Sequence, residues 1–303
     1  MKILVTGSTG LVGTALTQSF KDTEHTVCRL IRPGTAAESV SSSEGFDVSW
    51  DPETGHLGGA AVGAEAAVNL AGAPIAEARW NAQRKMMIRA SRVSTTRSLV
   101  AALAKMAIRP RVLVSASAIG YYGNRGDELL NEGSGPGSDF LSEIAKEWEA
   151  EALKAEALGI RVVCVRFGII LAKNGGALPK MVKAFRLGVG GKIGSGQQWM
   201  SWISLVDVVG ILRLALEDGT VRGPINVVAP QPVRNADFTQ ALAKALHRPA
   251  LFRVPAFALR LALGEMADAL LLASQRVQSA QLEKAGYRFL YPNLPDALAA
   301  VLS

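Results

Sequence analysis

The stretch GSTGLVG, residues 7–13, follows the apolar run Ile3-Leu4-Val5 after one residue and leads into a helix-like segment that starts at Leu11. Its glycines have the spacing G-x-x-G-x-x-G. In a strand–loop–helix unit, the first glycine permits a tight turn, the second lets a phosphate approach the backbone, and the third lets the helix pack closely. Free amide groups at the helix start favour a pyrophosphate. The stretch therefore predicts a dinucleotide-binding loop formed by Gly7, Ser8, Thr9, Gly10, Leu11, Val12 and Gly13.

Apolar runs of strand length recur along the chain, and helix-like stretches separate most of them. The expected strands are 3–5, 26–31, 67–70, 112–114, 162–165 and 225–228, and the expected helices are 11–21, 81–107, 138–157 and 206–216. This alternation predicts an α/β fold, a Rossmann-like doubly wound parallel sheet with helices on both faces.

Beyond Arg166 the pattern becomes irregular and rich in glycine, which indicates a smaller C-terminal lobe. Its expected helices are 236–245, 257–263, 265–272 and 276–285. We expect a cofactor-binding Rossmann domain over residues 1–170, to which strand 225–228 returns. Most of 171–303 then forms a substrate-binding lobe.

Composition excludes several classes of function. The net charge of +7 comes from scattered Lys and Arg residues, and aromatic content is only 6%, so an anionic ligand fits better than nucleic acid. Cys28 and Cys164 lie in apolar runs and are expected to be reduced core residues. The three histidines lie far apart in the sequence, so we expect no metal site.

The apolar stretch at the N-terminus is too short for a signal peptide, and no apolar run has the length of a membrane span. We therefore expect a cytoplasmic protein without a membrane partner. Oligomerisation remains open.

The end of the second strand indicates the cofactor. An enzyme that uses NAD places a carboxylate there, about 20 residues after the glycine loop, to bind the ribose hydroxyls. This chain has Arg32 instead, whose guanidinium can pair with a 2'-phosphate. The residue favours NADP(H), although a surface arginine that merely ends a strand is the alternative.

Several motifs together resemble the short-chain dehydrogenase/reductases of the extended, epimerase-like branch, in particular the NAD(P)-dependent epimerase family proteins of unassigned substrate. The resemblance runs nearly end to end, through NLAGAPI (69–75), SASAIGYYG (115–123), FRLGVGGKIGSG (185–196), WISLVDVV (202–209), GPINVVAP (223–230) and HRPALFRVP (247–255). It implies NADP(H) on the glycine loop and Arg32. It also implies an adenosine side lined by Leu70, Ala71 and Gly72, with Ser115 near the nicotinamide and Arg92 near the cofactor.

The resemblance does not extend to the superfamily's catalytic pair, a Tyr followed four residues later by a Lys. The corresponding helix reads DFLSEIAKEW (139–148), and no register supplies both residues. A tyrosine position at 140 puts Ile144 where lysine belongs. Ser117 and Tyr121, after the strand at 112–114, are the candidate catalytic residues, and Tyr122 is a further one. Lining of a substrate pocket is their alternative role.

Two further features leave alternatives open. Segment 188–202, with its glycines and tryptophans, fits either a flexible wall over an anionic or sugar-like substrate or a loop packed by Trp199 and Trp202. Arg166 either faces the ligand crevice or forms a salt bridge.

Two functions follow from these observations. The first is an NADP(H)-binding, epimerase- or reductase-like protein that acts on a small polar substrate, which could be nucleotide-linked. The alternative is a catalytically inactive NADP(H)-binding protein that serves as a sensor or scaffold. Such a role could be linked to division.

Overall fold

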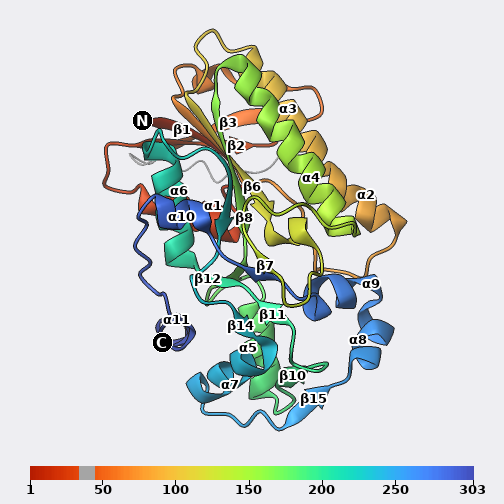
Figure 1. Ribbon diagram of the computed structural model, residues 1–303. Coiled ribbons are helices and arrows are strands. Elements are labelled where there is room, and N and C mark those ends of the chain that lie inside the picture. Colours follow the sequence, from red (N-terminus) through yellow and green to blue (C-terminus); the bar gives the residue numbers. More distant parts are fainter. Residues whose placement is uncertain (34–44) are drawn as a thin grey trace.

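The computed structural model describes residues 1–33 and 45–303, and an eight-stranded sheet forms its centre (Figure 1). The order is β13-β8-β6-β5-β1-β2-β3-β4, and neighbours are parallel except β4, which is antiparallel to β3. The strands are β1 Lys2–Thr6, β2 Thr26–Ile31, β3 Gly45–Asp51, β4 His56–Leu57, β5 Ala66–Asn69, β6 Val112–Ala118, β8 Arg161–Phe167 and β13 Gly223–Val227. The predicted fold class is confirmed, and β13 returns to the sheet beside β8 as expected.

Helices cover both faces of the sheet, because side chains of each strand alternate in direction. Ile3 and Val5 pack with the helices of one face, whereas Leu4 packs with those of the other. The first face carries α1 (Leu11–Ser19), α6 (Leu205–Glu217) and α10 (Ala280–Lys284); the second carries α2 (Ala82–Ala90), α3 (Val93–Ala104) and α4 (Phe140–Leu153) (Figure 1). Both faces of the sheet thus pack against apolar cores, as a doubly wound sheet requires.

The remaining elements lie at the bottom of Figure 1 and have a core of their own, which includes Phe185, Trp202 and Phe238. The helices are α5 Leu178–Arg186, α7 Asn235–Ala245, α8 Ala256–Leu263, α9 Glu265–Ala267 and α11 Leu294–Leu302. Short strands pair as β9 (Ile169–Leu171) with β12 (Trp202–Ser204), β10 (Gly191–Ile193) with β15 (Phe252–Val254), β11 (Trp199–Met200) with β14 (Val233–Arg234), and β7 (Leu129–Leu130) with β16 (Arg276–Val277). The division of the chain at residue 170 stays a prediction, since α6, β13 and α10 all join the sheet.

One expected helix is wrong in its continuity. The segment 81–107 forms α2 and α3, with a break at Ser91 and Arg92. The break has a local cause: the hydroxyl of Ser91 and the guanidinium of Arg92 both donate to the Ile88 carbonyl. In a continuous helix that carbonyl would accept the backbone amide of Arg92.

The expected helix 276–285 is also wrong at its start, because Arg276 and Val277 pair with Leu129 and Leu130 as a parallel bridge. Only Ala280–Lys284 is helical there. Tertiary pairing overrides local periodicity at these two residues. The expected helix 265–272 is helical throughout, as α9 followed by a π-helical turn over Asp268–Leu272.

Candidate cofactor and active site

The glycine loop lies at the point where the sheet reverses its strand order. From β1 the chain moves outward to β2 and β3, then returns to β5 on the other side of β1. Open α/β sheets bind ligands outside the carboxyl ends of the strands at such a point. Residues 7–13 follow β1, and Leu70, Ala71 and Gly72 follow β5, so the structure brings the two predicted cofactor segments together.

Gly7 and Gly13 are required by the packing of the chain itself. Gly7 has φ of +66°, and a Cβ there would lie 2.5 Å from the Leu70 carbonyl oxygen. A Cβ on Gly13 would lie 2.2 Å from the Gly7 carbonyl oxygen. These two glycines let the loop approach β5 and let α1 approach the loop.

Gly10 is different, because the chain around it leaves space for a side chain. It is exposed, its φ is −77°, and a Cβ would meet only the Gly7 carbonyl oxygen, at 3.3 Å. As the N-cap of α1 it offers no side-chain acceptor, and the amides of Leu11 and Val12 find no acceptor among the described residues. An exposed helix start with free amides and no side chain in front of it fits a pyrophosphate.

A buried polar network fixes the adenosine side of the loop. The Thr6 hydroxyl donates to Asn69 Oδ1 (2.8 Å) and accepts the amides of Leu70 (3.1 Å) and Ala71 (3.2 Å). Asn69 Nδ2 donates to the hydroxyls of Thr96 (2.7 Å) and Ser115 (3.2 Å). Ser115 is only 1% exposed. Its observed contact is therefore with the support of the loop, and a direct role at the nicotinamide stays a prediction.

Arg92 holds the next part of the same loop. Its guanidinium donates to the Ala73 carbonyl (3.1 Å) and lies so near Gly72 that a Cβ there would be 3.2 Å from Cζ. Burial, and then the nearby Arg84 charge, lowers the pKa of Arg92 to about 10, so it stays charged at neutral pH. A cation is thus fixed behind Gly72, which agrees with its expected place near the cofactor.

Arg32 follows β2 at the same edge of the sheet, one strand away from the glycine loop, and its side chain is exposed. This is the position from which a guanidinium can reach a 2'-phosphate.

Ser117 is part of a buried ion-pair network. Arg166 on β8 and Glu149 on α4 form a bidentate pair, with Nε–Oε1 and Nη2–Oε2 distances of 2.7 Å each. The Ser117 hydroxyl donates to Glu149 Oε1 at 2.6 Å and is only 2% exposed. Of the two alternatives for Arg166, the salt bridge is observed.

The same guanidinium contacts both tyrosines of the SASAIGYYG motif. Arg166 Nη1 donates to the Tyr122 hydroxyl (2.9 Å), which lies 2.7 Å from Asn226 Oδ1 on β13. Tyr122 is fully buried, and burial raises the pKa of its phenol to about 12. Arg166 Cζ lies 3.6 Å from the ring centre of Tyr121, which is partly exposed. Of the two rings, Tyr121 is thus the more accessible to a ligand.

With the tyrosine position taken at 140, the two positions of the missing Tyr–Lys pair carry apolar side chains. Phe140 begins α4 and makes an edge contact with Trp80, at 5.2 Å between ring centres. Ile144, one turn later, is 3% exposed. Lys85 of α2 lies over the Phe140 ring at 4.9 Å and pairs with Glu265 of α9.

In segment 188–202 the tryptophans pack, as the second alternative proposed. Trp202 is fully buried and its indole N–H donates to the Gln231 carbonyl (3.0 Å). Trp199 donates to Asp127 (2.9 Å), with the guanidinium groups of Arg234 and Arg276 at 4.2 and 4.7 Å from its ring centre. The segment is therefore a structured loop with a cationic margin.

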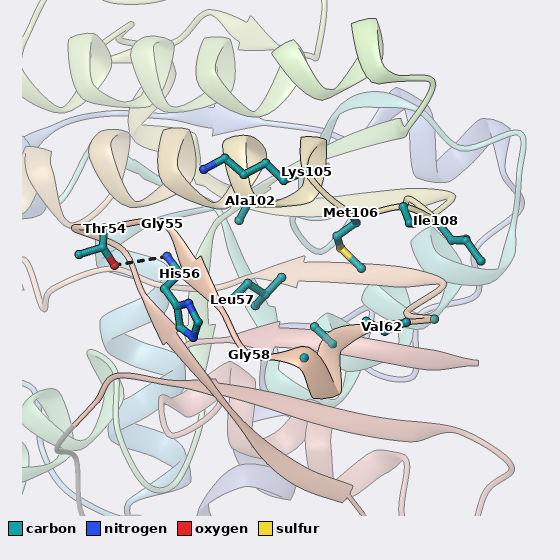
Figure 2. A pocket seen from close by; sticks show the side chains of 14 residues that line it. Thr54, Gly55, His56, Leu57, Gly58, Val62, Ala102, Lys105, Met106 and Ile108 are labelled. Atoms are coloured by element: carbon teal, nitrogen blue, oxygen red, sulfur yellow. Dashed lines mark hydrogen bonds between the residues drawn. The ribbon is translucent and has the colours of Figure 1, made fainter.

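A cavity of about 560 Å³ lies at the opposite edge of the sheet (Figure 2). His56, Lys105 and Met106 line it, together with residues 57–59 and 61–63. Those residues precede β5, and 106–108 precede β6, so the cavity is at the amino ends of the strands. It contains none of the predicted site residues.

No group of His, Cys, Asp and Glu side chains in residues 1–33 and 45–303 is arranged to bind a metal ion. No helix in the same ranges combines the length and the apolar character that a membrane span needs.

Sequence reasoning missed four residues that organise the site: Thr6, Asn69, Glu149 and Asn226. Three of them lie at or near the ends of buried strands, where an isolated polar residue in an apolar run is a detectable signal. Glu149 lies on a helix that carries other acidic residues, and Glu151 is equally buried, so only its contacts with Ser117 and Arg166 distinguish it.

Comparisons with known proteins agree with this geometry. The NAD dependent epimerase/dehydratase family matches residues 3–228, and a domain of unknown function, DUF1731, matches 254–301. An epimerase family protein of Mycobacterium bovis is 39% identical over 297 residues, which cover 98% of this chain and 96% of that protein. The chain therefore belongs to the NAD-dependent epimerase/dehydratase family, and it has that family's NAD(P)-binding fold.

Two solved structures are similar to this chain in both sequence and fold. Human epimerase family protein SDR39U1, solved with NADPH, is 34% identical and has a TM-score of 0.87, covering 99% of both chains. A nucleoside-diphosphate sugar epimerase of Corynebacterium glutamicum is 36% identical with a TM-score of 0.79; the alignment covers all of this chain and 58% of that one.

Proposed function

We propose that the protein binds NADP(H) and carries out an epimerase- or reductase-type reaction on a small polar substrate of the nucleotide-linked class, in the cytoplasm. The observation that carries the proposal is the helix start at Gly10, whose free amides and open front face fit a pyrophosphate at the switch point of the sheet. The similarity to a human protein solved with NADPH supports the choice of cofactor.

Each segment of the site would have a separate part in binding. The loop 7–13 would hold the pyrophosphate, Arg32 the 2'-phosphate, and Leu70 to Gly72 the adenosine side. The Thr6–Asn69 network keeps the last segment rigid, since its amides are bonded to a fully buried side chain. NADP(H), when bound, supplies hydride transfer.

Protons must be handled without a Tyr–Lys pair. Tyr121 is the candidate, because it is accessible and a fixed guanidinium lies against its ring. The Ser117 hydroxyl is directed to Glu149, so its first role is to position Glu149 and, through it, Arg166. In this arrangement Ser117 becomes a catalytic residue only if substrate binding draws its hydroxyl away.

The substrate class is supported by charge. Beside the lobe, Arg234 and Arg276 lie over Trp199, and Asp127 is the carboxylate paired with Arg234. This cationic margin suits a phosphate-bearing substrate, and the similarity to a nucleoside-diphosphate sugar epimerase points to the same class.

The test is a screen of nucleotide sugars and small carbonyl compounds that follows NADPH absorbance. With a substrate found, Tyr121→Phe should lower turnover by ~10²–10⁴-fold and leave NADPH affinity unchanged, the usual effect of a lost proton-transfer group. Equal turnover in Tyr121→Phe and Ser117→Ala would remove both residues from the mechanism.

The second candidate is an inactive NADP(H)-binding sensor or scaffold. The observation that favours it is that no register of α4 supplies a Tyr followed four residues later by a Lys. Tight NADPH binding together with no turnover across the whole screen would shift the assignment to this class.

A further inference from the structure

The end of the lobe that lies furthest from the sheet carries an exposed apolar group. The pairing of β10 with β15 is parallel and begins at Gly191 and Phe252. Residues just before the two strands therefore lie at the same end of this small ladder. Four large apolar side chains gather there and are more than half exposed: Leu187 (68%), Val189 (56%), Leu251 (84%) and Phe252 (58%). We call these four residues the tip.

The segments that build the tip carry cations without carboxylates. Residues 177–200 and 238–264, which build α5, β10, β15 and most of α7, contain no Asp or Glu. Lys180 donates to the Ala76 carbonyl. Six further exposed cations of these segments pair with no carboxylate in the described chain: Lys183, Arg186, Lys192, Lys244, Arg248 and Arg253. Elsewhere several surface arginines have acidic partners, as Arg89 has Glu147 and Arg125 has Glu128.

We propose that the tip docks on an anionic phospholipid bilayer. Protruding aliphatic and aromatic side chains enter the boundary between headgroups and acyl chains, and surrounding Lys and Arg residues attract anionic lipids. Such contact needs no membrane-spanning segment. The proposal therefore revises the expectation that the protein has no membrane partner, because that expectation rested on the lack of a spanning segment.

Other occupants fit the tip less well. A second copy in a two-fold contact would place six unpaired cations against six more, with no carboxylate between them. A nucleic acid would need aromatic faces for stacking, and Phe252 is the one aromatic among the four apolar residues.

Vesicle co-sedimentation tests the proposal on the full chain. Vesicles of phosphatidylcholine alone are compared with vesicles in which a third of the lipid is phosphatidylglycerol. The wild type should sediment with the anionic vesicles only, and added salt should release it. Leu251→Asp with Phe252→Asp, and separately Lys183→Glu with Arg186→Glu, should each weaken partitioning by roughly tenfold or more.

The control variant is Val62→Asp with Ile108→Asp, since both side chains are 69% exposed at the distant cavity. It should sediment like the wild type, and every variant should retain the wild-type thermal melt. No binding to anionic vesicles, equal binding to both kinds of vesicle, or equal loss in the control would overturn the proposal. So would a dimer in sedimentation velocity that Leu251→Asp dissociates, or preferential binding of an oligonucleotide over the vesicles.

Discussion

Alanine substitution at Gly10 and at Gly13 should have opposite consequences, although the two residues belong to one motif. Gly13 lies in the first turn of α1, where helix propensity alone favours alanine by about 1 kcal/mol. The packing around Gly13 makes the same substitution destabilising. A Cβ at 2.2 Å from the Gly7 carbonyl oxygen is about 1 Å inside the ~3.3 Å of a close carbon–oxygen contact.

Relief of that contact requires α1 to move away from the loop. Overpacking of this kind costs about 1–3 kcal/mol, to which the broken loop–helix contact adds. We expect Gly13→Ala to lose about 2 kcal/mol of unfolding free energy, after the propensity gain. In a chain of this size the melting temperature should fall by roughly 3 °C.

Gly10→Ala should leave the free protein almost unchanged. The new Cβ would contact only the Gly7 carbonyl oxygen, at a tolerable 3.3 Å. Replacing a glycine N-cap by alanine costs about 0.5–1 kcal/mol. The methyl group would, however, stand between the pyrophosphate and the amides of α1. Loss of two charge-assisted hydrogen bonds, about 1.5–3 kcal/mol each, should raise the Kd for NADPH by ~10²–10⁴-fold.

The assay is a thermal melt of the wild type and both variants, with and without NADPH, followed by calorimetry. NADPH should raise the melting temperature of the wild type but not that of Gly10→Ala. A Gly13→Ala protein as stable as the wild type without cofactor would refute the packing argument. An unchanged NADPH affinity in Gly10→Ala would show that the cradle is elsewhere.

Four further outcomes are expected. Arg32→Ala should weaken NADPH binding by about 1–3 kcal/mol in calorimetry and leave NADH unaffected; an equal loss for both would remove the phosphate contact. Burial raises the Tyr122 pKa from ~10 to about 12, so the neutral phenol stabilises the fold below pH ~10 and this contribution, about 2–3 kcal/mol, is lost as the pH rises towards 12; urea unfolding along this pH range should show the fall, and Tyr122→Phe should reduce it. Cys28 and Cys164 are buried and burial raises the pKa of both thiols, so a thiol reagent should react with neither until denaturant is added; rapid reaction of the native protein would contradict the structure. Glu149→Ala should destabilise the protein by about 3–5 kcal/mol because it leaves the Arg166 charge buried and unpaired, whereas Glu149→Gln should cost less, and chemical denaturation measures both.

The sequence by itself determined the sheet and its cofactor loop. Each strand predicted at 3–5, 26–31, 67–70, 112–114, 162–165 and 225–228 is present within a few residues. These strands are buried on both faces, so their apolar runs are unbroken and easy to recognise. The glycine loop could be recognised because few residue types other than glycine tolerate a positive φ or a close approach of the backbone. Strand β3 was missed, although Phe46, Val48 and Trp50 alternate with polar residues, as expected for a strand with one face more buried than the other.

Only the tertiary structure decided which polar residues act together. Ser117, Glu149 and Arg166 lie on three elements separated by up to 49 positions in the sequence, and nothing local marks them as partners. The bridge at Arg276 likewise depends on a contact with Leu129, far along the chain. Helix propensity and periodicity act over a few residues, whereas buried charges and short strands are stabilised by whatever the fold places beside them. That is why the cofactor loop could be identified from the printed sequence, while the neighbours of Ser117 and Tyr121 could not.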